Sequence, residues 1–123
     1  MGRIILSDYG FKKHHFHCES EYRSEDNPSW FWAPEVFDGK REMKSDVWSL
    51  GITLMELAEG KNPFERCDEV EMKFTLLEDD PPSLSDATWS FLFRMFVNAC
   101  VTKDVNERWS VGDLVDVGPC VRK

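Results

Sequence analysis

Residues 46–59 constrain the fold most, because a helix with so few polar positions has to be buried on most of its sides. The polar residues of this segment fall on one narrow stripe at helical spacing: Asp46, Ser49, Thr53 and Glu56. Ser45 is a plausible N-cap, and Gly60 is a plausible C-terminal stop. The pattern predicts a long helix at the centre of a core.

Other elements are expected on both sides of this helix. The β-branched run at residues 3–7 predicts a strand, and residues 10–31 have no stable period and are typical of a long irregular loop. Helical periodicity predicts three more helices: 68–78, 87–101, and one that begins at Ser110 and ends at Gly118-Pro119. The segment 87–101 is apolar enough to lie in the core. The expected fold class is therefore mainly α.

The net charge and the composition limit which classes of partner this protein can bind and in which cellular compartment it is expected. The net charge of -8 argues against nucleic acids and anionic membranes, because both are bound through basic patches. A hydrophobic fraction of 41% argues against a disordered chain. The four cysteines are widely spaced and form no C-x-x-C pair, and no apolar run is long enough to span a bilayer or to act as a secretory leader. We expect a cytoplasmic or nuclear protein with reduced thiols.

Three motifs carry the chemistry of this chain, and they follow one another in a fixed order: Asp8-Tyr9-Gly10, Ala33-Pro34-Glu35 and Ser45-Asp46-Val47-Trp48. An Asp after an apolar run can bind a metal ion, although an Asp in a turn is usually only a turn former. In this order and spacing the motifs resemble the protein kinase family over nearly the whole chain. The sequence of residues 45–60 is similar to the matching segment of sterile-20-like serine/threonine kinases and of their relatives in MAP kinase cascades.

The resemblance implies part of a kinase domain, the large C-terminal lobe. Residues 1–10 would be the strand and turn of the Asp-x-Gly motif, residues 11–35 the activation segment, and residues 36–123 the helical subdomain. The 123 residues contain no Gly-rich loop, strand Lys or catalytic loop, so the small lobe and the catalytic loop are expected to be absent. We expect a fragment that is inactive by itself and that can self-associate through uncovered apolar surfaces.

The family's nucleotide chemistry would fall on two residues of this chain. By resemblance, Asp8 is expected to bind Mg²⁺ together with ATP in the full-length parent, and Gly10 would permit the turn that follows. The parent would then transfer the γ-phosphate of ATP to hydroxyl groups of proteins. No cofactor is expected for the isolated chain.

Structural roles are implied for residues around the central helix. In the family, the counterparts of Glu35 and Arg108 form a buried ion pair that ties the end of the activation segment to the distal helices. The counterpart of Asp46 holds the catalytic loop. Trp48 is expected to be a structural residue of the central helix.

The activation segment contains hydroxyl groups that could accept phosphate: Ser20, Tyr22, Ser24 and Ser29. A phosphate there could order the segment by pairing with Arg side chains. Pro28 departs from the pattern of this branch, which usually has Thr at that distance before Ala-Pro-Glu, whereas tyrosine kinases often have Pro. The choice between serine/threonine and tyrosine specificity therefore stays open.

Two alternative functions remain besides that of a kinase fragment. A non-catalytic, pseudokinase-like module could bind a substrate or regulatory protein through Trp30–Trp32 and residues 61–80. Zinc binding could in principle use a cluster within five positions: His14, His15, His17 and Cys18. However, the sequence contains no second half-site at a recognisable spacing, so zinc is the weaker alternative.

Overall fold

The computed structural model describes residues 3, 5, 28–85 and 88–121. Its elements are the short 3₁₀ helix η1 (Pro28–Phe31) and the helices α2 (Pro34–Phe37), α3 (Met43–Glu59), α4 (Glu69–Glu78), α5 (Phe91–Cys100) and α6 (Val111–Val121). No strand occurs among the residues described. The mainly α fold class is therefore confirmed, and it agrees with the large lobe of a kinase.

The N-terminal predictions lie mostly outside the described residues. Arg3 and Ile5, within the expected strand at 3–7, are not part of a strand. The expected loop at 10–31 is described only from residue 28 on. There the loop prediction is wrong, because Pro28–Phe31 forms the turn η1. Its backbone closes through a hydrogen bond from the Trp32 N–H to the Ser29 carbonyl.

Helix α3 begins earlier than its sequence indicates. Its N-cap is Glu42 and not Ser45, which lies in the first turn and accepts a hydrogen bond from the Glu42 N–H at 3.1 Å. The predicted stop at Gly60 is confirmed. Gly60 adopts a φ of 73°, a left-handed conformation in which glycine has no side chain to clash, and its N–H bonds to the Glu56 carbonyl.

The three helices predicted after α3 are all present, but the residues at which they begin or end differ from the prediction. Helix α4 begins after Asp68, whose carboxylate accepts from the Glu71 N–H. Helix α5 begins only at Phe91, because the Ser90 hydroxyl caps it by accepting from the Phe93 N–H. The predicted start of this helix at residue 87 is therefore wrong.

Helix α6 has the predicted start and a later end. The Ser110 hydroxyl accepts from the Asp113 N–H, and the Asp113 carboxylate accepts from the Ser110 N–H in return. The predicted end at Gly118-Pro119 is wrong, since the helix continues to Val121. Proline lacks one backbone donor, but its fixed φ is compatible with helical backbone, so one proline does not always end a helix.

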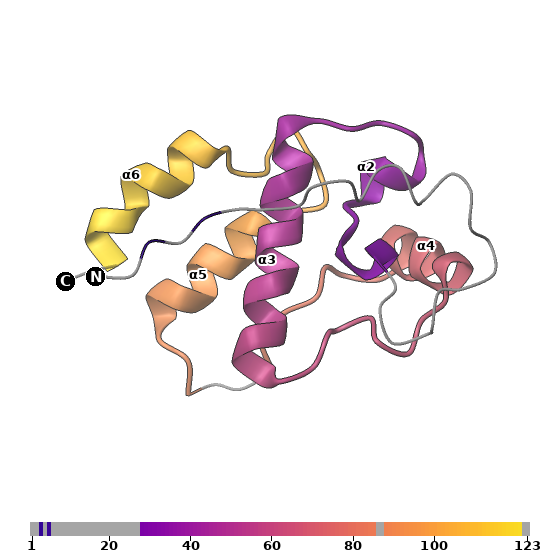
Figure 1. Ribbon diagram of the computed structural model, residues 1–123, viewed down its shortest axis with the longest axis horizontal. Helices are drawn as coiled ribbons and strands as arrows, with labels where there is room; N and C mark the ends of the chain where they lie inside the picture. The colour runs from indigo at the N-terminus through magenta and orange to yellow at the C-terminus, as the bar shows by residue number, and fades with distance from the viewer. Residues whose placement is uncertain (1–2, 4, 6–27, 86–87, 122–123) are drawn as a thin grey trace.

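Helix α3 is the centre of the arrangement (Figure 1). Helices α5 and α6 lie on one side of it, and α2 and α4 lie on the other. Its buried residues Trp48, Ile52 and Met55 belong to one hydrophobic core that also takes in residues of α4, α5 and α6. Helix α5 packs directly against α3. At this contact, a Cβ atom on Gly51 would lie 2.7 Å from the Cβ atom of Cys100, so glycine is what allows the close approach.

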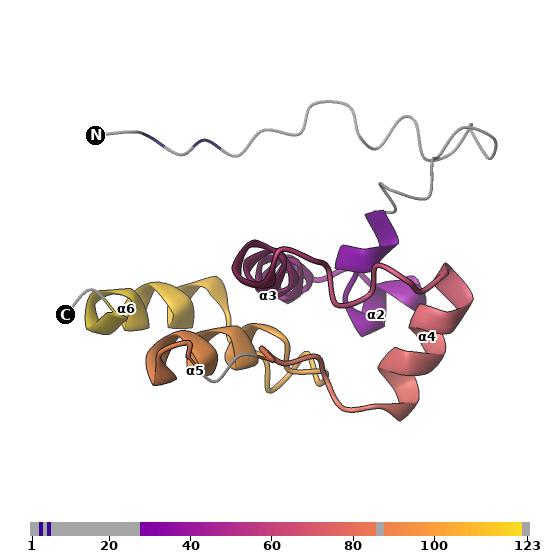
Figure 2. The same cartoon turned by 90° about the horizontal axis from the view of Figure 1, so that it is seen from below.

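One face of α3 is uncovered in the described part of the chain. Figure 2, turned by 90°, shows α5 below α3 and no described helix directly above it. Leu50 is 41% exposed and Leu57 is 77% exposed. The expectation that α3 is buried on most sides is confirmed, but its one exposed face also carries these two apolar side chains. In α5, Phe91 is also exposed, so that helix lies only partly in the core.

Among the described helices, none combines the length and the apolar character that a membrane-spanning helix needs.

Candidate functional site

The densest polar cluster of the described structure surrounds the guanidinium group of Arg108. Its Nη1 donates to Glu35 Oε1 at 2.7 Å and to the Lys44 carbonyl at 2.9 Å. Its Nη2 donates to Glu35 Oε2 at 3.0 Å and to the Lys103 carbonyl at 3.2 Å, and its Nε donates to the Thr102 carbonyl at 2.8 Å. All five N–H donors of the guanidinium are therefore used. We call this set of bonds the Arg108 network.

Burial of the two side chains increases the contribution of these bonds to the stability of the fold. The Arg108 side chain is 0% exposed and that of Glu35 is 9% exposed, so water cannot replace a lost partner. A two-pronged bond between guanidinium and carboxylate is the strong form of such a pair. Removal of one member would leave the other charge buried and uncompensated, at a cost of about 3–5 kcal/mol.

Glu35 is held in its ionised form. Burial acts to raise the pKa of this carboxyl, but the hydrogen bond from Arg108, the bonds from its own backbone and from Ser45, and the positive charge of Arg108 outweigh burial and lower the pKa below its usual value. The Ser45 hydroxyl donates to Glu35 Oε1 at 2.8 Å. A carboxylate with this many donors is fixed in place and has little tendency to bind a proton.

Trp48 lies against the network from inside the core. Its ring centroid is 5.3 Å from the guanidinium carbon of Arg108, which is within the range of a cation–π contact. The indole is fully buried, and its Nε1–H has no hydrogen-bond partner among the described residues. Trp48 therefore supports the charged group by packing.

The segment from η1 to α2 is fixed to the helices at several points. The Ser49 hydroxyl on α3 donates to the Phe31 carbonyl at 2.7 Å, and the Trp30 Nε1–H donates to the Cys67 carbonyl at 2.9 Å. The rings of Trp32 and Phe37 contact edge to face. Together with Glu35, these contacts hold residues 28–37 against α3 and against the loop that precedes α4.

The chemistry of this site is structural. Among the described residues, both charged groups of the Arg108 network have their hydrogen-bond partners in place, as expected for a group that holds segments together. The structure thus brings Glu35, Arg108 and Trp48 together. Asp46 is placed elsewhere: it lies in the first turn of α3, is exposed, and has no hydrogen bond or ion pair within the described residues.

The remaining predicted site residues lie mostly outside the described part of the chain: Asp8, Gly10, Ser20, Tyr22 and Ser24, together with the cluster His14, His15, His17 and Cys18. Ser29 is described and is only 2% exposed. Its role as a phosphate acceptor stays a prediction, and it would require the segment to open. Within the part of the chain that the structure describes, no group of three or more His, Cys, Asp and Glu side chains could hold a metal ion.

Sequence reasoning missed several partners of the network. The carbonyl groups of Lys44, Thr102 and Lys103 accept from Arg108, but any residue type provides a carbonyl, so no sequence signal marks them. The sequence predicts a capping role for Ser45 but gives no sign of its bond to Glu35.

Comparison with known proteins matches this chain to protein kinases. Residues 1–117 match the protein kinase domain family. The chain is 35% identical over 117 residues to the serine/threonine-protein kinase pakH of Dictyostelium discoideum, which covers 94% of this chain and 23% of that protein. It is 36% identical over 118 residues to the serine/threonine-protein kinase TAO3 of Gallus gallus, which covers 93% of this chain and 13% of that protein.

A third relative is the dual specificity mitogen-activated protein kinase kinase hemipterous of Drosophila melanogaster. It is 36% identical over 114 residues, which cover 87% of this chain and 10% of that protein. The chain therefore spans between 10% and 23% of the length of these three relatives.

Proposed function

Because this chain belongs to the protein kinase domain family, we propose that it is the C-terminal part of a domain that transfers the γ-phosphate of ATP to hydroxyl groups of proteins. Serine and threonine are the proposed acceptors, since the relatives pakH and TAO3 are named serine/threonine kinases. The transfer is a property of the full-length parent in this proposal.

The Arg108 network is the observation that supports this proposal most. Phosphoryl transfer depends on positioning of the reactants and on electrostatic stabilisation, and much less on covalent chemistry by the protein. A segment that presents a protein substrate therefore needs a rigid end. Glu35 supplies that end, because Arg108 and Ser45 hold its carboxylate on the helices.

Nucleotide binding is proposed for the segment that precedes the described helices. Asp8 would bind Mg²⁺, and Gly10 would allow the chain to turn away. When bound between the phosphates, the metal ion neutralises the charge that develops during transfer. A carboxylate has the hard oxygen ligands that Mg²⁺ prefers, but a single carboxylate binds Mg²⁺ with ATP too weakly to be useful.

The isolated chain is proposed to be inactive, and the uncovered face of α3 supports this. Exposed Asp46, Leu50 and Leu57 lie on that helix without a covering element among the described residues. In the parent, further sequence with the catalytic loop would cover them. In isolation, apolar surface of this kind favours self-association.

A radiolabel assay tests the activity. The full-length parent is incubated with γ-³²P-ATP, Mg²⁺ and myelin basic protein, and label in the substrate is counted. We expect incorporation by the parent, background counts from Asp8→Ala, and parental activity from the matched control Asp116→Ala, which changes an exposed residue of α6. Equal activity of the parent and Asp8→Ala would contradict the assignment of Asp8. Incorporation by residues 1–123 alone would contradict the proposed inactivity.

A second candidate is a non-catalytic module that binds proteins, and the surface of α4 favours it. Val70, Phe74 and Leu77 are 65%, 64% and 60% exposed and recur at helical spacing along one stripe. Stripes of this kind often mark contact with another protein. For this candidate, the parent would give background counts in the radiolabel assay, and its melting temperature would not rise with Mg²⁺ and ATP.

A further inference from the structure

Two adjoining cavities run along α5 on the side of the loop that precedes it. The first, of about 370 Å³, is lined by residues that include Leu84 and Arg94. The second, of about 490 Å³, extends past the end of α5 as far as Glu107. Ser83 and Asn98 line both cavities, so the two cavities adjoin and together make up a groove. We call it the α5 groove.

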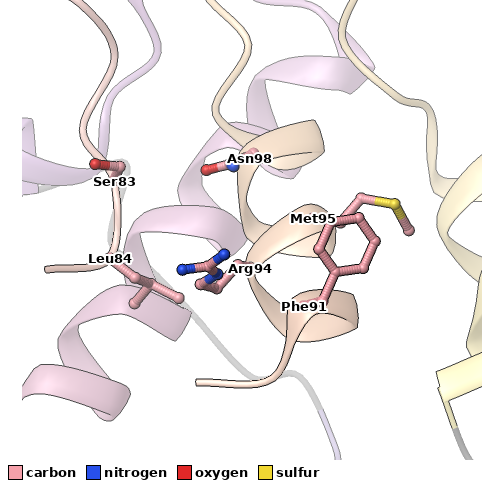
Figure 3. A pocket seen from close by; sticks show the side chains of 6 residues that line it. All are labelled: Ser83, Leu84, Phe91, Arg94, Met95 and Asn98. Atoms are coloured by element: carbon pink, nitrogen blue, oxygen red, sulfur yellow. The ribbon is translucent and has the colours of Figure 1, made fainter. Parts of the chain in front are cut away.

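The first end of the α5 groove carries an unpaired positive charge. Figure 3 shows Arg94 and Asn98 pointing from α5 toward the loop that carries Ser83 and Leu84. Arg94 is exposed, and its guanidinium has no hydrogen bond or ion pair within the described residues. Phe91, which is 71% exposed, adds apolar surface at this end. A carboxylate with an apolar neighbour would match these groups.

The second end has the opposite charge. Three acidic residues are among the described residues that line it: Asp80, Asp104 and Glu107. Among the described residues that line this end, the one cation is Lys103, and its ammonium group already donates to the Asp79 carbonyl. A basic side chain would therefore be attracted here, while a carboxylate would be repelled.

The length of α5 sets the spacing of the two charges. Arg94 and Val101 are seven positions apart, which corresponds to about 10 Å along a helix with a rise of 1.5 Å per residue. An extended peptide covers about 3.3 Å per residue. Asp104 and Glu107 lie beyond Val101, so the span is at least this long, and side chains on one face of an extended segment are an even number of residues apart. Side chains four residues apart, at about 13 Å, would therefore reach Arg94 at one end and the acidic residues at the other.

We propose that the α5 groove binds an extended segment of a partner protein in which a basic side chain lies four positions from an acidic one. The acidic side chain binds Arg94, the basic one binds Asp104 and Glu107, and an apolar side chain next to the acidic one packs on Phe91. A uniformly charged polymer such as a nucleic acid fits only one of the two ends. The proposal is independent of phosphoryl transfer.

Fluorescence anisotropy tests this proposal on the full-length protein without ATP. The probes are fluorescein-labelled peptides Ala-Glu-Leu-Ala-Ala-Arg-Ala and its reverse order, because the direction of the bound segment is open. A third peptide carries Gln at both charged positions. We expect one of the two charged peptides to bind at least about threefold more tightly than the Gln peptide, since each charge gains one partner. Equal binding of all three, or no binding, would overturn the proposal.

Charge reversals locate the binding site. Arg94→Glu and Glu107→Lys should each weaken binding of the better peptide by about three- to tenfold, because each replaces an attraction with a repulsion. The matched controls Arg66→Glu and Glu65→Lys change the net charge equally at exposed positions outside the groove, and should stay within about twofold. Equal losses in the test and control variants would show an effect of net charge only and would overturn the proposal.

Sedimentation velocity of the same variants separates a partner segment from a second copy of the chain. We expect Arg94→Glu to leave the oligomeric state unchanged. Self-association that Arg94→Glu abolishes would assign the α5 groove to a second copy and would overturn the proposal of a partner segment.

Discussion

Replacement of Gly51 by alanine tests the packing of α5 on α3. The new Cβ atom would lie 2.6 Å from Val101 Cγ1 and 2.7 Å from Cys100 Cβ, whereas ordinary van der Waals contact begins at 3.4 Å. The Val101 methyl group can move by rotation of its side chain. The Cβ atom of Cys100 is attached to the backbone of α5, so the helix itself has to shift.

The two effects of this substitution have opposite signs. In an exposed helix interior, Gly→Ala stabilises by about 1 kcal/mol through helix propensity. Overpacking of a tight contact costs about 1–3 kcal/mol. We therefore expect no net stabilisation from Gly51→Ala. The control is Gly112→Ala in the first turn of α6, where the nearest atom to the new Cβ is 3.6 Å away and nothing has to move.

Urea unfolding followed by circular dichroism measures the difference. Gly51→Ala should have a free energy of unfolding about 1–3 kcal/mol below that of Gly112→Ala, with similar dependence on urea concentration. If the two variants are equally stable, the close contact between the helices does not exist, and the reasoning is refuted.

The remaining predictions concern the Arg108 network and its surroundings. The lowered pKa of Glu35 adds stability that is present above the ordinary glutamate pKa and is lost as the pH falls through the folded value, so the acid dependence of unfolding should be shallower in Glu35→Gln. Ser45→Ala removes the hydroxyl between Glu42 and Glu35 and should cost about 1–2 kcal/mol in urea unfolding, whereas a neutral effect would contradict the bond. Burial raises the pKa of Cys100 to about 12, so iodoacetamide should label it far more slowly than a free cysteine at pH 8, and rapid labelling in the folded protein would disprove its burial.

The central helix and its stop were predictable because they depend on local chemistry. Apolar periodicity over residues 46–59 and the left-handed preference of Gly60 act within a few residues of the chain. The start of α3 was not predictable. The Ser45 hydroxyl had an alternative partner in Glu35, ten positions away, and only the tertiary structure brings the two together.

Exposure was harder to predict than helicity. The sequence shows that Leu50 and Leu57 are apolar and share one face of the helix, but not which neighbour covers them, and in the described residues none does. The pairing of Glu35 with Arg108 came from the family resemblance and not from spacing, because 73 positions separate the two residues. The three carbonyl acceptors of Arg108 depend on the path of the backbone, which no residue type encodes.

The account depends most directly on the coupling between Glu35 and Arg108. A double-mutant cycle with Glu35→Gln, Arg108→Met and the double variant measures it in urea unfolding. Arg108→Met alone should cost about 3–5 kcal/mol, and Arg108→Lys replaces it in the cycle if that variant does not fold.

Because each residue is the other's buried partner, the double variant should lose less than the sum of the single losses, with a coupling of about 1–3 kcal/mol. Single losses that add to within about 0.3 kcal/mol would show that the two side chains do not pair inside the fold, and would contradict the account.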